Sequence, residues 1–119
     1  MKFRLAETYL LLAEAYLGQN MPDKAAQAVN VVRKRAGASQ ITASQMDMDF
    51  LLDERIRELS GEESRRFTLV RTKKLLERAK KYNSAVKDKI TDKDLLWPIP
   101  QVIEDANTGA SFPQNPGYN

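Results

Sequence analysis

Two helical patterns joined by a very short connection constrain this chain more than any other feature. The first covers about residues 3–17, and its apolar stripe consists of Leu5, Tyr9, Leu12, Ala13 and Tyr16. The second starts near Pro22, since proline suits the first position of a helix, and its expected buried face is Ala25, Ala26, Val29, Val32 and Ala36. Only four residues separate Gly18 from Asp23, so the two helices are expected to pack antiparallel.

Glycines mark the ends of both predicted helices. Gly18 follows the last periodic residue of the first pattern and is expected to take the left-handed conformation that ends a helix. Gly37 ends the second pattern after Arg33, Lys34 and Arg35, whose charges suit the negative end of a helix dipole.

The helix pair of residues 1–37 resembles one tetratricopeptide repeat. Small Ala13 and Ala25 allow the helices to approach closely, and larger Tyr9, Tyr16 and Val29 surround them. The sequence shows one clear repeat, whereas repeat arrays need about three to bury a continuous core. We therefore expect the native protein to continue upstream of Met1.

A second helix pair is expected over residues 43–82. Thr42 and Gln45 match a capping box, Ser44 and Asp47 form a weaker candidate cap, and a third helix then runs to about Ser60. The apolar face of this helix is predicted to hold Met48, Leu51, Leu52, Ile56 and Leu59. After a break at Gly61, a fourth helix is predicted over residues 63–82, with Phe67, Val70, Leu75, Ala79 and Tyr82 facing inward.

Residues 83–119 are predicted to form a loop-rich tail. Residues 83–94 are polar and are expected to be a loop, whereas residues 95–100 are expected to be extended because Pro98 and Pro100 disfavour helical geometry in their predecessors. A short helix over residues 101–106 and an irregular end follow, and such an end is ordered only if it packs back on the chain. The fold predicted for residues 1–119 is thus a single all-α domain.

The composition excludes several kinds of site. There is no cysteine and no histidine, so disulfides, thiolate metal sites and the usual general base near neutral pH are absent. Asp47, Asp49 and Asp53 lie on a predicted helix without the glycine and terminal glutamate of a calcium loop, so no metal or cofactor site is predicted. The longest apolar run, Tyr9–Ala13, is too short to span a bilayer.

Positive charge is concentrated in residues 65–93. This stretch holds 11 Lys/Arg and 3 Asp/Glu, a net charge of +8, whereas the rest of the chain has a net charge of −5. A solvated helix face is the favoured interpretation, because no aromatic residues that could stack on bases are interleaved with the lysines. Nucleic-acid binding is therefore not expected, and it would show as a steep salt dependence of affinity.

The densest charge lies in residues 53–71. Glu54 and Glu58 share one face of the third predicted helix, with Arg55 one step round, and Arg65 and Arg71 come from the next helix. We predict a structural salt-bridge cluster of these five residues across the Gly61 turn, because the planar guanidinium group can bind a carboxylate through two parallel hydrogen bonds.

A hydrolase that uses Glu54 and Glu58 as paired carboxylates is the enzymatic alternative. Acid–base catalysis needs one carboxyl whose pKa is raised by an environment without nearby cations. Five arginines surround the two glutamates in this stretch, so no catalytic residue is predicted and the chain is not expected to be an enzyme.

Trp97 and Tyr118 are candidate minor glycan contacts, because aromatic rings stack on the faces of sugars. For Trp97, which is flanked by Leu96 and lies close to Ile99, a core position beneath the extended segment is the favoured interpretation.

The order of these residues resembles the C-terminal end of the SusD/RagB family. The resemblance is carried by Glu54-Arg55, Glu58-Leu59, Gly61-Glu62, Arg65, Phe67, Leu69, Arg71, Ile99-Pro100, Asn107 and Gln114-Asn115-Pro116-Gly117-Tyr118. Residues 4–16 and 31–37 also look like the helical lead-in of that family. The chain departs from the family pattern at Glu63, Arg66 and Thr68, where glycine, an aromatic residue and aspartate are common.

The resemblance implies a tetratricopeptide-like scaffold within a lipid-anchored protein on the outer surface of the outer membrane. Such proteins bind oligosaccharides, or in some cases peptides, and cap a TonB-dependent transporter of the SusC type. The lipid anchor and most of the ligand site would lie in an N-terminal part that is missing here. This segment is then expected to supply scaffold and at most a minor share of the glycan site.

The alternative is a cytoplasmic helical-repeat adaptor that binds a peptide or an acidic partner. Residues Met1–Arg4 lead directly into a helical pattern without a signal peptide or a lipidation cysteine. Further tandem repeats upstream would favour the adaptor, and an upstream signal sequence with a lipidation cysteine would favour the glycan-binding protein.

Overall fold

The computed structural model of the chain describes residues 4–118, and all regular structure within that range is helical. The elements are α1 (Leu5–Gly18), α2 (Pro22–Arg35), η1 (Ala43–Gln45), α3 (Met48–Glu58), α4 (Arg65–Arg71), α5 (Leu75–Tyr82), η2 (Asp92–Leu95) and α6 (Gln101–Ala106). The all-α prediction is confirmed, and no helix in the described part reaches the length and apolar character needed to cross a bilayer. The chain divides into two compact units, the first ending at Glu63 and the second starting at Ser64. The single domain predicted over residues 1–119 stays a prediction.

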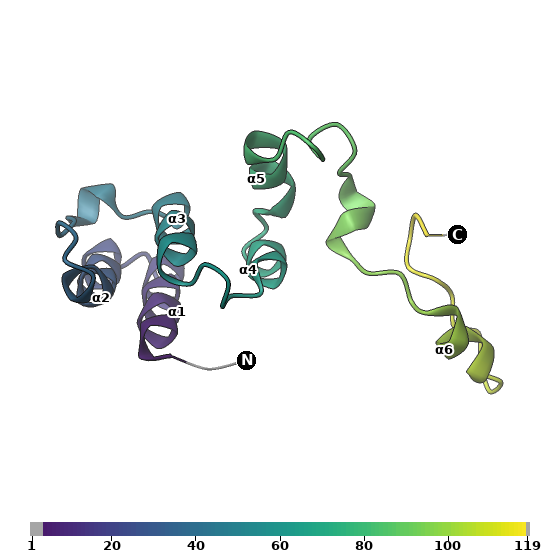
Figure 1. Cartoon of the computed structure of the whole chain (residues 1–119). Helices are drawn as coiled ribbons and strands as arrows, with labels where there is room; N and C mark the ends of the chain where they lie inside the picture. The colour runs from purple at the N-terminus through teal and green to yellow at the C-terminus, as the bar shows by residue number, and fades with distance from the viewer. Residues whose placement is uncertain (1–3, 119) are drawn as a thin grey trace. The chain divides into compact units, whose positions relative to one another are not determined.

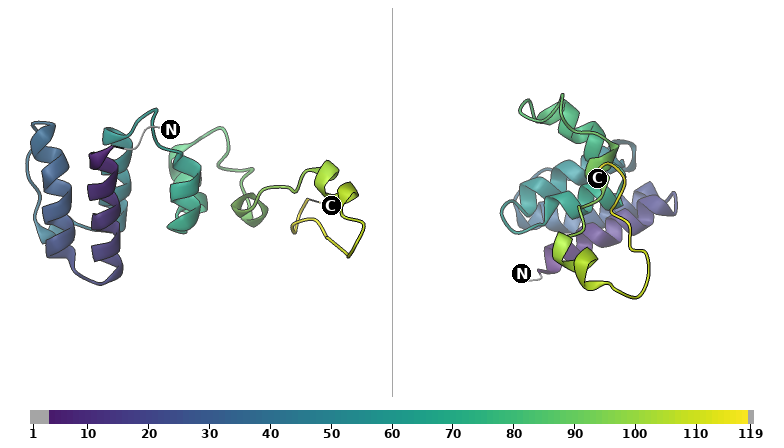
Figure 2. Two further views of the ribbon diagram at one scale, coloured as in Figure 1. Left: turned by 90° about the horizontal axis from the view of Figure 1, so that it is seen from below. Right: turned by 90° about the vertical axis from the view of Figure 1, so that its right-hand side faces the viewer.

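The first unit is built on the predicted antiparallel helix pair. Helices α1 and α2 lie side by side, and α3 packs against both (Figures 1 and 2). The start predicted at Phe3 lies outside the described residues, and the chain is helical from Leu5. The side-chain amide of Asn30 binds the loop after α2, since it donates to the carbonyl oxygen of Ile41 at 2.9 Å and accepts from the Ile41 N–H at 2.9 Å.

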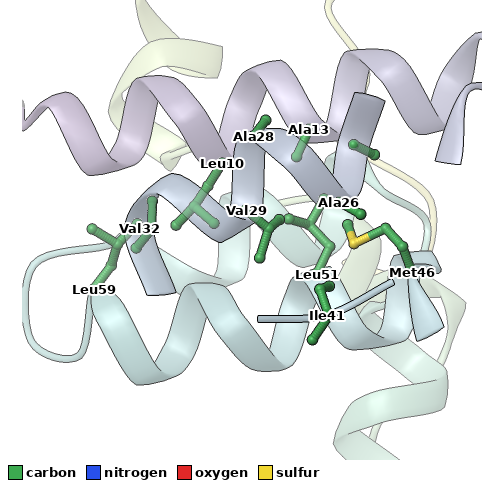
Figure 3. Close-up of a cluster of buried hydrophobic side chains, with 11 residues drawn as sticks. Leu10, Ala13, Ala26, Ala28, Val29, Val32, Ile41, Met46, Leu51 and Leu59 are labelled. Atoms are coloured by element: carbon green, nitrogen blue, oxygen red, sulfur yellow. The ribbon is translucent and has the colours of Figure 1, made fainter. Parts of the chain in front are cut away.

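A cluster of buried apolar side chains from α1, α2, α3 and the loop between α2 and α3 holds this unit together (Figure 3). Leu10, Ala13, Val29 and Leu51 are fully buried in it. The sequence analysis missed Leu10 and placed Leu5, Leu12, Ala36 and Ile56 in the core, whereas all four are exposed. Because α1 is apolar on nearly all sides, its periodicity alone did not select the buried face.

The end of α1 differs from the prediction. Gly18 is the last residue of the helix, and Asn20 takes the left-handed conformation, with φ of 56°. The Asn20 N–H donates to the carbonyl of Leu17 at 3.0 Å and the Met21 N–H to that of Tyr16 at 2.9 Å, as in a Schellman motif. Asparagine tolerates this conformation better than most side chains, so the signal lay two residues after the glycine. Gly37, with φ of 70°, ends α2 as expected.

The Thr42–Gln45 capping box is present but caps the short helix η1 rather than α3. Helix α3 starts at Met48, and the Asp47 side chain caps it by accepting from the Phe50 N–H at 2.7 Å. The capping box was therefore predicted at the correct residues, but it was assigned to the wrong helix.

In the second unit, the single helix predicted over residues 63–82 is two helices, α4 and α5. They are separated at Lys73, whose φ of 58° is left-handed and incompatible with a continuous helix. Phe67 and Tyr82, predicted to face inward, are exposed. The buried positions are Thr68, Leu69, Leu75 and Arg78.

Before α6 the tail contains a short helix that was not predicted. From α6 onward its structure agrees with the prediction. Residues 92–94, expected to be loop, and Leu95, expected to be extended, form η2, because Thr91 and Asp94 make a second capping box. Helix α6 has the predicted bounds, and residues 107–118 contain no helix or strand. After α6 the chain turns back towards residues 96–99 (Figure 1).

Candidate functional site

Two sets of side chains stand out, an arginine–carboxylate network in the first unit and a group of contacts between the end of the chain and residues 93–99 in the second. The network centres on α3. Glu54 Oε2 accepts from Arg33 Nη1 at 2.7 Å and from Arg57 Nη2 at 2.8 Å and Nε at 3.0 Å. Both guanidinium groups also lie 5.6 Å from the Phe50 ring, so the carboxylate and the ring together hold them in place.

One turn later on α3, Glu58 binds an arginine at the start of α1 and another at the end of α2. Its Oε1 lies 3.0 Å from Arg4 Nη2 and 2.7 Å from Arg35 Nη2. Arg4, at the start of α1, also donates to the Glu58 carbonyl oxygen at 2.8 Å and pairs with Glu62 at 2.6 Å. The Glu58 side chain is 7% exposed, so these contacts satisfy a largely buried charge.

The most buried ion pair crosses the turn at Gly61. Arg55 Nε and Nη2 both lie 2.6 Å from Glu63 Oε1, and the two side chains are 2% and 5% exposed. Arg55 also lies 4.0 Å from Glu7 of α1. Gly61 has φ of 77°, the left-handed geometry that turns the chain so that Glu63 comes back against α3.

Glu54, Arg55 and Glu58 each form ion pairs on α3, with three different sets of partners. Arg65 and Arg71 lie in α4 of the second unit, and the predicted cluster of these five residues stays a prediction. The ion-pair partners not predicted from the sequence are Arg4, Arg33, Arg35, Arg57 and Glu63. The signal for Arg33 and Arg35 was there, since they end a helix that packs beside α3, but it was assigned to the helix dipole alone.

The network has the chemistry of a clamp. Each of Glu54, Glu58 and Glu63 lies within 3.0 Å of at least one guanidinium nitrogen. The contacts of these carboxylates with arginines are typical of a structural role. Among residues 4–118 no group of acidic side chains is arranged to hold a metal ion.

In the second unit, the side chains of the closing Gln114–Tyr118 stretch bind the extended backbone after η2. Gln114 Oε1 accepts from the Ile99 N–H at 2.7 Å, and Gln114 Nε2 donates to the Ile99 carbonyl at 2.9 Å. Asn115 Nδ2 donates to the Trp97 carbonyl at 2.7 Å, and the Tyr118 hydroxyl donates to the Leu96 carbonyl at 3.1 Å. We call these contacts the tail latch.

Gly117 allows the latch to close. Its φ is 88°, and a Cβ added there would lie 2.8 Å from Cβ of Lys93. The Lys93 amine in turn lies 5.7 Å from the centre of the Tyr118 ring. Each of Gln114, Asn115, Gly117 and Tyr118 therefore has a specific contact with residues 93–99.

Trp97 lies on the surface, which corrects the core position favoured from the sequence. The residue is 60% exposed, and the Arg66 guanidinium lies 4.3 Å from the ring centre. Arg66 also donates to the carbonyls of Asp94 and Leu96. Arg66 thus fixes the Trp97 ring. The aromatic residue that the family pattern favours at this position would instead add to a core.

A sequence profile of the SusD family matches residues 1–118. The chain belongs to the SusD family. This SusD-family chain is 41% identical over 75 residues to the SusD-like protein P25 of Formosa agariphila. The alignment covers 58% of this chain and 14% of that protein, so the matched region is a small part of the relative. No solved structure matches the chain.

The family match spans both units of the SusD chain. It includes the α3 network and the tail latch, and the resemblance noted from Glu54-Arg55 to Tyr118 is confirmed at the level of the family. The closing residues thus lie within the family match and also have a structural role in this chain.

Proposed function

We propose that this chain is the scaffold segment of a surface glycan-binding protein that delivers oligosaccharides to a TonB-dependent outer-membrane transporter. The observation that carries the proposal is the SusD family match over residues 1–118. The resemblance implies that the parent protein carries a lipid anchor on a part upstream of this segment. The ligand would then bind mainly through that part.

The geometry of the first unit supports the scaffold role. Three helices share one apolar core, and the network on α3 fastens α1, α2 and the Gly61 turn to it. Such an arrangement holds a surface in a fixed shape. The carboxylates that could have served an enzyme are all paired with arginines, which supports a binding protein without catalytic residues.

The experiment is to follow the parent protein in its own bacterium with an antibody raised against this chain. We expect it in the outer-membrane fraction, sensitive to protease added to intact cells, and co-purifying with a TonB-dependent transporter. A soluble cytoplasmic protein would overturn this function and support the helical-repeat adaptor.

The division of labour has its own test. Because most of the ligand site is proposed to lie upstream, the isolated 119-residue chain should bind oligosaccharides weakly or not at all in calorimetric titrations. Tight binding by the chain alone would contradict the scaffold role and place the main glycan site here.

A further inference from the structure

We propose that Trp97 is a preformed platform on which one pyranose ring of an oligosaccharide stacks. This inference rests on the proposed function and deepens it, because it assigns a ligand contact to a segment otherwise described as scaffold. It starts from Trp97, the only tryptophan of the chain, a residue that is 60% exposed.

The ring is held from one side. The Arg66 guanidinium lies 4.3 Å from its centre, and Arg66 is itself fixed by donating to the carbonyls of Asp94 and Leu96. A cation at this distance over an aromatic face is an attractive contact. With the residue 60% exposed, the surface of the indole that Arg66 does not cover is open to a ligand.

The backbone under the ring is fixed as well. Asn115 binds the Trp97 carbonyl, Tyr118 binds the Leu96 carbonyl, and Gln114 binds both polar groups of Ile99. Pro98 adds a fixed φ next to the ring. A side chain held in its bound geometry loses little conformational freedom when a ligand arrives, which is how preorganisation strengthens a small contact.

The chemistry of the surroundings favours a sugar ring. The polar side chains of the latch are already used on backbone groups, so the site offers an aromatic face rather than new hydrogen bonds. A pyranose suits such a face, because its axial C–H groups form an apolar surface while its hydroxyls point outward to water. Tyr118 has a different role from Trp97, since its hydroxyl is bonded and its ring lies beside Lys93, and we assign it as a positioning residue.

The first test uses the fact that Trp97 is the only tryptophan in the chain. A glycan array of plant, algal and microbial oligosaccharides is probed with the parent protein, and the best binder is then titrated at millimolar concentrations into the 119-residue chain. We expect the Trp97 emission to shift to shorter wavelength and its quenching by acrylamide to fall. An unchanged emission spectrum of the chain at the highest oligosaccharide concentration, together with unchanged affinity of the parent protein when Trp97 is replaced by alanine, contradicts the platform.

The second test uses variants of the parent protein. Trp97→Ala should weaken binding of the same oligosaccharide about threefold to tenfold, the range expected for loss of one aromatic stacking contact, and Trp97→Phe should recover part of it. Gln114→Glu removes the donor to the Ile99 carbonyl and should increase acrylamide quenching of Trp97 in the chain. Gln40→Glu makes the same charge change at an exposed loop position and should leave both readouts unchanged.

The outcomes separate the two proposals. If the parent protein binds an oligosaccharide and Trp97→Ala does not alter its affinity, the platform is wrong and the proposed function stands. If Trp97→Ala reduces co-purification of the transporter but not sugar binding, the ring is a protein contact and the platform is also wrong. If the parent protein binds no oligosaccharide on the array, the proposed function fails and the platform fails with it.

Discussion

At the scale of single residues, the two units use the same device. Asn30 binds the N–H and the carbonyl of Ile41, and Gln114 binds the N–H and the carbonyl of Ile99. In both cases one side-chain amide makes the two hydrogen bonds that a neighbouring β-strand would make with the backbone of that residue. A buried or half-buried backbone group needs such a partner, so each amide permits irregular chain where the fold has no sheet.

Gly117 provides the sharpest residue-level prediction. Gly117→Ala places a methyl group against Lys93 and forces alanine into the left-handed region, so the latch should lose about 1–2 kcal/mol. Urea unfolding followed by Trp97 emission measures the change. Gly109→Ala is the matched control, because a Cβ at that position meets nothing within 4 Å and should have little effect. Equal effects of the two variants would rule out the latch geometry.

The Arg55–Glu63 pair provides a second residue-level prediction. Glu63→Gln removes the charge that lies 2.6 Å from the buried Arg55 guanidinium and leaves Glu7 at 4.0 Å, so it should reduce the free energy of unfolding by about 3 kcal/mol. The comparison is Glu77→Gln, which breaks the exposed pair with Lys74 and should cost less than about 1 kcal/mol. Denaturant melts monitored by circular dichroism give both values, and similar losses would mean that the buried pair contributes no more than a surface one.

At the scale of elements, the chain shows what periodicity decides and what it leaves open. Helices α1, α2 and α6 were placed within a few residues, because proline, glycine and spaced apolar residues agree there. The break between α4 and α5 was missed, because Lys73 carries no turn signal. In the sequence Lys73 looks like one more basic residue of a helix. Its left-handed geometry accompanies two hydrogen bonds, from the Lys73 N–H to the Val70 carbonyl and from the Lys74 N–H to the Leu69 carbonyl.

The break between α4 and α5 predicts that two lysine-to-glycine substitutions change the stability of the second unit in opposite directions. Lys73→Gly should stabilise the second unit by about 1 kcal/mol, because glycine takes φ of 58° without the penalty of a side chain. Lys80→Gly, within α5, should destabilise it by about the same amount through lost helix propensity. Thermal unfolding of the two variants decides the matter, and destabilisation by both would show that residue 73 is helical in solution.

At the scale of the whole molecule, the main apolar core lies within one of the two units. Every member of the main buried cluster lies between Leu10 and Leu59, within the first unit. The spacing of Glu54 and Glu58 placed both carboxylates on one face of a helix, but it did not identify their partners. Arg33, Arg35 and Arg4 lie 21 to 54 residues away along the chain from the glutamates that they bind, and only the packing of α1 and α2 on α3 reveals these pairs.

A fragment ending at Glu63 should therefore fold by itself. We expect it to unfold cooperatively in urea with most of the helical signal of α1, α2 and α3, whereas residues 64–119 alone should lose their signal gradually because no comparable cluster is found among their described residues. Circular dichroism of the two fragments measures this. A gradual transition for residues 1–63 would mean that the core needs the rest of the chain.

The side-chain pairing of the extended segment has a consequence for solubility. Residues 96–100 are apolar and irregular or extended, the combination that lets an exposed strand edge recruit another chain and aggregate. Here Pro98 and Pro100 have no N–H to offer, and Gln114 occupies both polar groups of Ile99. A neighbouring molecule thus finds few free backbone partners along this stretch, and the closing residues of the chain protect it against cross-β association.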